Sequence, residues 1–464
     1  MKVLLLGSGA REHALARSLA RDPAVSALIA LPGNPGIASL ARCRPGDPAD
    51  PEVVIEVATS MQVDLVVVGP EAPLVAGVAD EVRAAGIPCF GPSAEAARLE
   101  GSKAFAKEVM TAAGVPTAAA HVCTTLDAVE MALSATGSPF VVKEDGLAAG
   151  KGVVVCASRD EALAHAAACL GREDGRVVVE DFLDGPEVSL FCLADGRTVV
   201  PLEPAQDFKR VGDGDAGPNT GGMGAYTPLP WAPEGLVEQV VRTVAEPTVR
   251  EMADRGMPFV GLLYIGLALT PAGPRVIEYN ARFGDPETQS VLARLRTPLA
   301  GVLLAAAQGR LAELPPLEWS PQSSVTVVVA ADGYPAGPHT GDPVQGIDEA
   351  ESVDGVHVLQ AGTRVHESHG QLVSAGGRVL SVVALGDDLT QARERAYAGV
   401  SHISLRASHH RRDIAERAAA GEIEMPSLAG VLDAVSAGAG PGTAVAASGD
   451  THAEEPTRSP SQEP

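Results

Sequence analysis

An apolar run at residues 276–287, VIEYNARFGDPE, ends in a group of polar and charged side chains. If its first half is a strand, Glu278 and Asn280 lie two residues apart and share one face, opposite Ile277 and Tyr279. Their oxygen atoms suit Mg2+, which takes one or two protein ligands and completes its shell with phosphate and water. A salt-bridged edge strand is the alternative, but it does not explain why the apolar run is followed by so many charges: Arg282, Asp285 and Glu287.

A second candidate stretch is glycine-rich and reads KEDGLAAGKG at residues 143–152. It is not a Walker A loop, because only three residues separate Gly146 from Gly150, and Gly152 rather than Ser or Thr follows Lys151. The flanking runs PFVV and VVVC are strand-like, so we predict a hairpin with basic residues on and near its tip. A phosphate-binding loop and an ordinary surface hairpin fit these ten residues equally well.

The N-terminal loop GSGARE lies where a predicted strand meets a predicted helix. It matches a dinucleotide-binding turn only in part, because Glu12 replaces the third glycine and no acidic residue follows the second strand near Ala30. We therefore do not expect NAD to bind. The N–H groups of a helix start suit an anion such as a sugar phosphate, and Arg11 can add charge-assisted bonds. A tight turn without a ligand is the alternative.

A third stretch, DGDAGPNTGGMG at residues 213–224, contains five glycines. Glycine lets the backbone approach a ligand closely. The loop is long and has no apolar anchors, which favours a mobile substrate lid or binding loop over a plain flexible connection.

The elements that must position these stretches fall into successive regions. Residues 1–102 alternate apolar strands with helical patterns, which predicts a parallel α/β sheet. Residues 101–117 are predicted to form a helix, and a mixed region with six further strand-like runs extends to residue 322. Residues 323–425 are β-rich and then helical. Residues 426–464 lack a periodic apolar face and are predicted to be disordered.

Composition limits the class of protein. The chain has 464 residues, enough for about three domains, and a formal charge of −24, which argues against general nucleic-acid binding. Six scattered cysteines without metal-ligand spacing indicate core thiols in a reducing compartment. The first apolar run is too short for a signal peptide, and no apolar stretch is long enough to span a membrane. A cytoplasmic enzyme without nucleic-acid or membrane partners is therefore expected.

Taken together, these stretches closely resemble the phosphoribosylamine–glycine ligases (glycinamide ribonucleotide synthetases), which are ATP-grasp enzymes of purine synthesis. The resemblance runs in order from residue 1 to about residue 420. RFGDPE with GPNTGGMG is specific to this family. The other segments that carry the resemblance include GSGAREHA, PGNPG, VVGPEAPL, GSKAFAK, VVKEDGLAAGKGV, VVEDFLDGPEVS and HHRRDIAERA.

The resemblance implies a multidomain fold of the α/β and α+β classes. An N-terminal parallel-sheet α/β domain (1–102) is followed by central ATP-grasp domains (103–322, flap about 118–190) and a small β-rich C-terminal domain (323–425). It implies that the chain joins glycine to 5-phosphoribosylamine with ATP and Mg2+ or Mn2+, as a monomer, through glycyl phosphate. The alternative in the same class is another ATP-grasp carboxylate–amine ligase or a carboxylase of purine metabolism. A dinucleotide oxidoreductase and a catalytically dead scaffold are the more distant alternatives.

The resemblance also assigns residues. The implied nucleotide-binding set is Lys103, Lys143, Gly146, Gly150, Lys151, Gly152, Glu180, Phe182, Leu183 and Glu187. The implied substrate-binding set is Gly9, Arg11, Glu12, Asn219, Thr220, Gly221, Arg282 and Asp285. Glu278 and Asn280 match the metal ligands, and the implied catalytic residues are Lys143, Lys151 and Arg282. The chain departs from the family pattern at two positions, Glu144 and Phe208.

Overall fold

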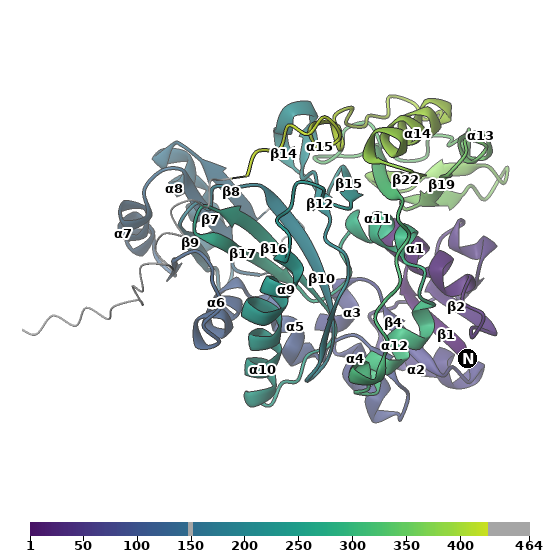
Figure 1. Cartoon of the computed structure of the whole chain (residues 1–464), viewed down its shortest axis with the longest axis horizontal. Helices are drawn as coiled ribbons and strands as arrows, with labels where there is room; N and C mark the ends of the chain where they lie inside the picture. The colour runs from purple at the N-terminus through teal and green to yellow at the C-terminus, as the bar shows by residue number, and fades with distance from the viewer. Residues whose placement is uncertain (147–151, 426–464) are drawn as a thin grey trace, which may run out of the picture. The chain divides into compact units, whose positions relative to one another are not determined.

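The computed structural model describes residues 1–146 and 152–425 (Figure 1). Its N-terminal sheet is parallel throughout, with the strand order β3-β2-β1-β4-β5. The strands are β1 (Lys2–Gly7), β2 (Ala27–Pro32), β3 (Arg42–Cys43), β4 (Leu65–Val68) and β5 (Cys89–Phe90). The helices are α1 (Ala10–Ala20), η1 (Ile37–Ser39), α2 (Pro51–Met61), α3 (Glu71–Val75), α4 (Val78–Ala84) and α5 (Ala94–Gly101). The predicted parallel α/β region is confirmed.

Both faces of this sheet are buried, which explains why its strands read as continuous apolar runs. Successive side chains of a strand point to opposite faces. In β1, Leu4 and Leu6 accordingly belong to one hydrophobic cluster, whereas Val3 and Leu5 belong to another. The strand ends at Gly7, so the turn into α1 lies at the carboxyl edge of the sheet.

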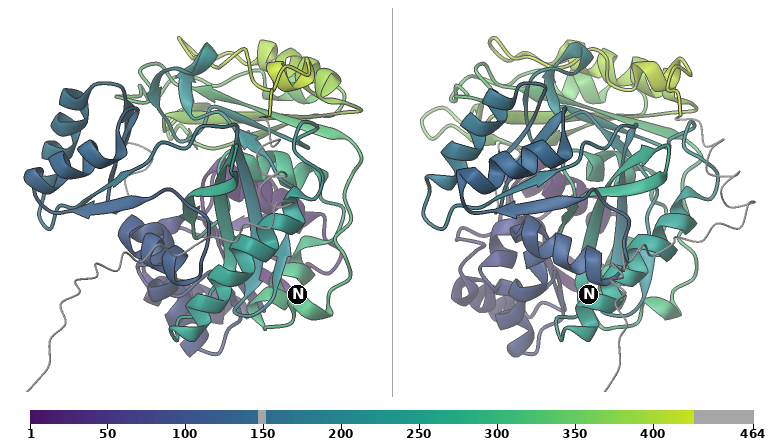
Figure 2. Two further views of the ribbon diagram at one scale, coloured as in Figure 1. Left: turned by 60° about the vertical axis from the view of Figure 1, so that its left-hand side comes forward. Right: turned by 90° about the vertical axis from the view of Figure 1, so that its left-hand side faces the viewer.

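A small antiparallel sheet, which we call the flap sheet, has the strand order β6-β9-β7-β8. It consists of β6 (Ala120–Cys123), β7 (Phe140–Glu144), β8 (Val153–Cys156) and β9 (Val177–Glu180). Helices α7 (Leu126–Thr136) and α8 (Arg159–Leu170) pack on it and share a separate hydrophobic cluster with it (Figure 2). The predicted pairing of β7 with β8 is confirmed, and the loop between them at residues 147–151 lies outside the described residues.

The central antiparallel sheet has the strand order β11-β10-β16-β17. Its strands are β10 (Glu187–Asp195), β11 (Val199–Pro201), β16 (Val260–Thr270) and β17 (Gly273–Asn280). Its nearby helices are α6 (Lys103–Ala112), α9 (Leu236–Val240), η3 (Val241–Ala245) and α10 (Glu246–Asp254). The helix predicted over residues 101–117 is found as α6 but is shorter. It begins after Ser102, whose side chain caps it by accepting a hydrogen bond from the Phe105 N–H, and it ends at Ala112.

A third sheet combines strands from two distant parts of the sequence, in the order β12-β15-β18-β22-β19. From the central region come β12 (Gln206–Asp207) and β15 (Gly224–Thr227), and from the C-terminal region come β18 (Ser323–Ala330), β19 (Val356–Gln360) and β22 (Arg378–Gly386). The C-terminal region is β-rich, as predicted, but part of its sheet comes from the central segment. Its helices are α13 (Ile347–Glu351), α14 (Leu389–His402) and α15 (Glu416–Ala419).

The remaining elements connect these sheets. Two helices follow β17, namely α11 (Glu287–Arg294) and α12 (Leu299–Ala307), and a short turn of helix follows at η4 (Leu311–Glu313). Two hairpins stand apart from the larger sheets: β13 (Arg210–Gly212) with β14 (Ala216–Asn219), joined by η2 (Asp213–Asp215), and β20 (Thr363–Val365) with β21 (Leu372–Ser374).

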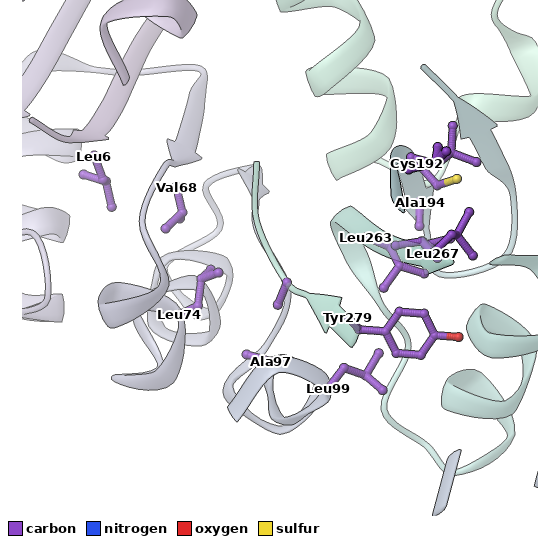
Figure 3. Close-up of a cluster of buried hydrophobic side chains, with 14 of the residues drawn as sticks. Leu6, Val68, Leu74, Ala97, Leu99, Cys192, Ala194, Leu263, Leu267 and Tyr279 are labelled. Carbon is purple, nitrogen blue, oxygen red and sulfur yellow. The ribbon is translucent and has the colours of Figure 1, made fainter. Parts of the chain in front are cut away.

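One hydrophobic cluster extends through the N-terminal, central and C-terminal regions. It contains Leu6 and Val68 of the parallel sheet and Leu263 and Tyr279 of the central sheet, as Figure 3 shows. Valines of β18 and β22 continue it. The described residues accordingly form one compact unit by their contacts. Within the described residues, each helix is too short or too polar to cross a bilayer.

Candidate active site

A cavity of about 1140 Å³ opens among residues of all three regions. Arg11 and Glu71 come from the N-terminal region, Lys143 from the flap sheet and Arg378 from the C-terminal region. The structure brings many of the predicted residues together in its walls: Arg11, Lys143, Glu180, Phe182, Leu183, Glu187, Asn219, Thr220, Gly221, Glu278, Asn280, Arg282 and Asp285.

Other predicted residues lie elsewhere. Among the described residues, those outside the cavity lining are Gly9, Glu12, Lys103, Gly146 and Gly152. Lys103 remains connected to the flap, because its Nζ donates a hydrogen bond to the Gly146 carbonyl at 2.9 Å. Gly150 and Lys151 fall outside the described residues.

Glu180, at the end of β9, is held between two lysines. Its Oε2 lies 3.0 Å from Lys143 Nζ and 3.2 Å from Lys107 Nζ, and all three side chains are buried. Lys143 Nζ also donates to the Ile277 carbonyl at 2.9 Å, and Lys107 Nζ donates to Thr117 Oγ1 at 2.8 Å. Burial lowers the pKa of Lys107, and the Glu180 carboxylate opposes that effect. This network connects the flap sheet to β17 at one end of the cavity.

Lys209 forms the second cationic centre of the cavity. Its Nζ lies 2.9 Å from Glu187 Oε2 and 3.6 Å from Glu278 Oε1. Burial acts against its charge, but Glu187, Asp207 and Glu278 raise the pKa of Lys209 well above its ordinary value. Lys209 therefore offsets the negative charge of two carboxylates, that of Glu187, which is predicted to bind ribose, and that of Glu278, which is predicted to bind metal.

The two predicted metal ligands fit a hard divalent cation by their chemistry. Burial acts to raise the pKa of Glu278, but Lys209, Lys143, Lys103 and Arg282 hold it below its ordinary value, so the carboxylate is ionised. Asn280 adds an amide oxygen from the same strand. Within residues 1–146 and 152–425, no three His, Cys, Asp or Glu side chains form a metal-binding group. A cation here would thus need phosphate and water to complete its shell.

The alternation expected along β17 is broken at one residue. A β-bulge opposite Gly266 and Leu267 interrupts the register. Tyr279 is buried as predicted, but Ile277 is only partly buried and lines the cavity together with Glu278. The prediction that Ile277 and Tyr279 both face away from the site is therefore wrong for Ile277, because a bulge adds one residue to the strand without a partner.

Arg282 is held by acidic side chains from the N-terminal region. Its Nη2 lies 3.0 Å from Glu100 Oε1, and its Nε lies 3.5 Å from Glu71 Oε2. Burial acts against the charge of Arg282, but Glu100 and Glu71 raise its pKa above the ordinary value. The guanidinium is thus fixed in the cavity wall beside Asn280, whose Oδ1 accepts a hydrogen bond from Nη2 at 3.5 Å.

Glu12 supports the first glycine loop from inside. Its Oε2 accepts a hydrogen bond from the Gly9 N–H at 2.6 Å, and its Oε1 accepts one from Arg11 Nε at 2.5 Å. Arg11 Nη1 in turn donates to the Phe283 carbonyl at 3.1 Å. Only Arg11 of these three predicted substrate residues lines the cavity. Gly9 and Glu12 instead cap α1 and orient Arg11.

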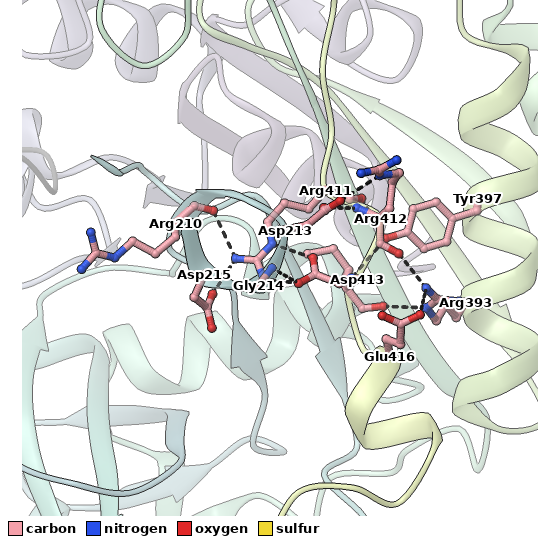
Figure 4. Close-up of polar contacts among 11 residues, drawn as sticks. Arg210, Asp213, Gly214, Asp215, Arg393, Tyr397, Arg411, Arg412, Asp413 and Glu416 are labelled. Atoms are coloured by element: carbon pink, nitrogen blue, oxygen red, sulfur yellow. Dashed lines mark hydrogen bonds and ion pairs between the residues drawn. The ribbon is translucent and has the colours of Figure 1, made fainter. Parts of the chain in front are cut away.

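The glycine-rich loop at residues 213–224 has polar anchors at its tip, and at its end Met223 is fully buried, so the expectation that it lacks apolar anchors is wrong. At its tip, Asp215 pairs with Arg411 at 2.6 Å, Asp213 pairs with Arg412 at 2.8 Å, and the Gly214 N–H donates to Asp413 (Figure 4). Most of the predicted lid therefore forms the β13–β14 hairpin, whose tip is tied to the C-terminal region. The role as a substrate lid or binding loop stays a prediction, and Asn219, Thr220 and Gly221 line the cavity. The ion pairs at the tip could not be predicted, because the partners lie about 200 residues away in the sequence.

Arg378 lines the cavity from the C-terminal region. Its Nη1 donates to the carbonyls of Gly221 and Asp285, at 2.5 and 2.8 Å, and its Nη2 lies 3.1 Å from Asp285 Oδ2. One C-terminal arginine thereby joins the loop that carries Asn219 and Thr220 to the RFGDPE turn.

Lys107, Lys209, Arg378 and Arg411 were not predicted as site residues. Lys107 follows Lys103 by one helical turn in KAFAK, and a spacing of four residues on one helix face was a usable signal. Lys209 lies in QDFKR next to Phe208, one of the departures from the family pattern. Nothing local in the sequence distinguishes Arg378 or Arg411 from other arginines, because their partners are distant in the chain.

One testable consequence concerns His13 of α1. Its Nδ1 accepts a hydrogen bond from the Gln360 N–H at 2.8 Å, and burial, with help from Arg17, lowers the pKa of His13 to about 4. The unfolded chain has a pKa near 6.5. The unfolded state therefore binds more protons between these values, and stability is lost as the pH falls from about 6.5 to about 4. We expect His13→Gln to reduce this loss, measured by urea unfolding at pH 7 and pH 5, and an unchanged pH dependence would contradict the assignment.

The comparisons with known proteins agree along almost the whole chain. Family models described as phosphoribosylglycinamide synthetase match it as an N domain at residues 1–100, an ATP-grasp (A) domain at 101–288 and a C domain at 324–417. The chain is 63% identical over 421 residues to a phosphoribosylamine–glycine ligase of Streptomyces coelicolor, covering 90% of this chain and 100% of the relative. It is 54% identical over 431 residues to that of Mycobacterium tuberculosis, covering 92% and 100%.

Solved structures show the same similarity. A crystal structure of phosphoribosylamine–glycine ligase from Thermotoga maritima aligns with a TM-score of 0.77 and 31% identity, covering 89% of this chain and all of that one. The biotin carboxylase domain of a Hydrogenobacter thermophilus carboxylase aligns with a TM-score of 0.65 over 88% of this chain and 91% of that one. Its identity is 15%, which shows the shared fold alone. The three family models and these relatives together establish that the chain belongs to the phosphoribosylglycinamide synthetase family.

Proposed function

We propose that the chain is a phosphoribosylamine–glycine ligase that joins glycine to 5-phosphoribosylamine, with conversion of ATP to ADP and phosphate. The family membership and the names of the relatives support the substrates. The observation that carries the proposal is the shared cavity, which is lined both by Lys143 and Glu180 and by Arg282 and Asp285. ATP and the ribosyl amine can therefore meet at the strand that carries Glu278.

The end of the cavity beside the flap sheet receives the nucleotide. Phe182 and Leu183, which follow β9, offer backbone groups to the adenine ring, and Glu180 offers a carboxylate to its exocyclic amine. Glu187 binds the ribose, since its carboxylate borders the cavity and is held by Lys209. Lys143, whose Nζ bonds to Glu180 and to the Ile277 carbonyl, contacts the nucleotide beside them in this proposal.

The chemical step needs charge neutralisation rather than a side-chain nucleophile. The glycine carboxylate attacks the γ-phosphorus of ATP and gives glycyl phosphate and ADP. The ribosyl amine then attacks the acyl carbon and expels phosphate. Charge spreads over the transferred phosphoryl oxygens, so fixed cations lower the barrier. Lys143 and Arg282 supply them, the sequence adds Lys151 as a further candidate, and a Mg2+ or Mn2+ ion held by Glu278 and Asn280 would supply further positive charge when bound.

The far end of the cavity receives the amine substrate. Arg11, held toward the cavity by Glu12, and Arg282, held by Glu100, offer guanidinium groups to the sugar phosphate or the glycine carboxylate. Asn219, Thr220 and Gly221 border the same space with hydrogen-bonding groups, and Asp285 can accept from an amine. Glycyl phosphate hydrolyses readily, so the site must exclude water while it exists.

A product assay tests the proposal. ADP release should require glycine and freshly generated phosphoribosylamine together, and glycinamide ribonucleotide should form in equal amount. Omitting either substrate, or replacing glycine by bicarbonate or formate, should leave only background release. Release of ADP that depends on bicarbonate or formate would instead identify another ATP-grasp ligase or carboxylase.

We further propose that the enzyme works in the cytoplasm as a monomer.

We expect the segment after residue 425 to be dispensable. The relatives match over their whole length to about nine-tenths of this chain, and the last residues have no periodic apolar face. A chain that ends at residue 425 should keep the thermal midpoint and kcat of the full chain. A large loss of either quantity, measured by calorimetry and by the product assay, would show that the boundary is misplaced.

A further inference from the structure

A second, smaller cavity lies outside the catalytic one. Its volume is about 230 Å³, several times the roughly 30 Å³ that one water occupies in the liquid. Its walls come from α1, α11, β19 and β22 and include Arg17, Ser18, Arg21, Gln289 and His357. We call it the α1–β19 cavity. None of these residues lines the catalytic cavity.

The positive charge of this cavity is not balanced by ion pairs. Arg17 lies in the last turn of α1, and Arg21, an exposed residue, is the C-cap of the helix four residues further on. No acidic side chain of residues 1–146 or 152–425 forms an ion pair with either of them, although the protein carries a formal charge of −24. Glu351 acts on Arg17 only from beyond ion-pair distance, and its Oε1 accepts a hydrogen bond from the Val358 N–H.

The polar groups around the cavity are also incompletely bonded. Among the described residues, Arg17 Nε and Gln289 Oε1 are buried without hydrogen-bond partners. Gln289 and His357 are themselves more than nine-tenths buried. Burial and the two arginines lower the pKa of His357 well below its ordinary value, so its ring is neutral and can donate one N–H. Buried groups without partners are rare in native structures and call for a ligand or a water.

We propose that the α1–β19 cavity binds a small phosphate-bearing anion. Two guanidinium groups, a serine hydroxyl and a neutral imidazole offer donors to phosphate oxygens, and guanidinium forks match phosphate geometry. A hydrogen phosphate also carries an O–H that can donate to Gln289 Oε1. Gln289 Nε2 donates to Asp285 Oδ1 at 2.7 Å, so a hydrogen bond joins a wall residue of this cavity to a wall residue of the catalytic cavity.

Calorimetry and thermal unfolding on the full chain test the proposal at constant ionic strength, with inorganic phosphate and glycerol 3-phosphate as separate probes. Arg17→Gln and Arg21→Gln should each weaken binding roughly 10–100-fold, as expected for one lost charge-assisted hydrogen bond. Arg42→Gln, which removes an exposed arginine of β3 from the same region, is the matched control and should bind as the unchanged protein does. Binding of glycerol 3-phosphate but not inorganic phosphate would identify an ester as the ligand.

The same variants distinguish a binding role from a structural one. Without phosphate, Arg17→Gln and Arg21→Gln should keep or raise the thermal midpoint, because they relieve repulsion between two unpaired cations. Phosphate binding that is equal in these variants and in the control would overturn the proposal, since the anion would then occupy the catalytic cavity or the general surface. The absence of any binding to the unchanged protein at millimolar phosphate would overturn it as well.

Discussion

Replacing Glu278 by Gln is expected to lower kcat by at least roughly 10–100-fold while the fold is retained. Changes in groups that only support metal ligands often cost that much, and Glu278 is the one carboxylate in the pair proposed to hold the metal. The substitution is nearly isosteric on β17. Lys209 keeps its ion pair with Glu187, so the local charge balance does not collapse. Product formation and the thermal midpoint are the two measurements.

The Mg2+ dependence of the variant gives a sharper test. Weaker metal binding should raise the Mg2+ concentration needed for half-maximal rate, and excess Mg2+ should restore part of the rate by mass action. Glu251→Gln is a matched control, because Glu251 also pairs with a cation and is similarly exposed, but lies on α10 away from the cavity. Unchanged turnover and Mg2+ dependence in Glu278→Gln would remove the metal assignment and favour the edge-strand alternative.

Local pattern was sufficient to predict the six strand-like runs of the central region. The runs FVVKED and PRVIEYN form β7 and β17, and the pairing of β7 with β8 follows from their short separation. The bulge in β17 could not be predicted, because it depends on how the strand fits its neighbour β16. Pairing of β15 with β18 joins residues about 100 positions apart, which no local signal encodes.

The candidate site was predictable where one motif carries the chemistry. Glu278 and Asn280 were identified because a strand places alternate residues on one face. Glu12, predicted as a substrate residue, lies outside the cavity lining and bonds to Gly9 and Arg11, and these contacts depend on the three-dimensional turn. Lys209 was missed for a similar reason. Its partners, Glu187 and Glu278, lie on two other strands, and only the folded sheets bring the three charges together.

Arg411 presents the second large effect, this time on stability. Its side chain is 1% exposed, and its guanidinium lies 4.7 Å from the centre of the Phe208 ring. It bonds to Asp215 at 2.6 Å and to both oxygens of Asp413, as Figure 4 shows. The group is thus fully used in holding the tip of the β13–β14 hairpin to the C-terminal region.

We expect Arg411→Met to lower the free energy of unfolding by about 3 kcal/mol at pH 7. Removing one partner of a buried ion pair typically costs about 3–5 kcal/mol, and the low end applies because Asp215 is largely exposed. Arg412→Met removes the same charge from the next residue, whose side chain is 81% exposed, and should cost less than about 1 kcal/mol. Equal losses in the two variants would mean that burial does not decide the effect.

The pH dependence of the difference identifies its cause. Burial acts to raise the pKa of Asp413, but hydrogen bonds from Arg411 and the Gly214 N–H hold it below its ordinary value. A carboxylate with a lowered pKa stabilises the fold above its unfolded pKa, near 3.9, and loses that contribution as the pH falls further. The gap between the unchanged protein and Arg411→Met should therefore narrow below about pH 4. If the difference in unfolding free energy between the two proteins is constant from pH 7 to pH 3, packing of Arg411 against Phe208, rather than the ion pair, stabilises this junction.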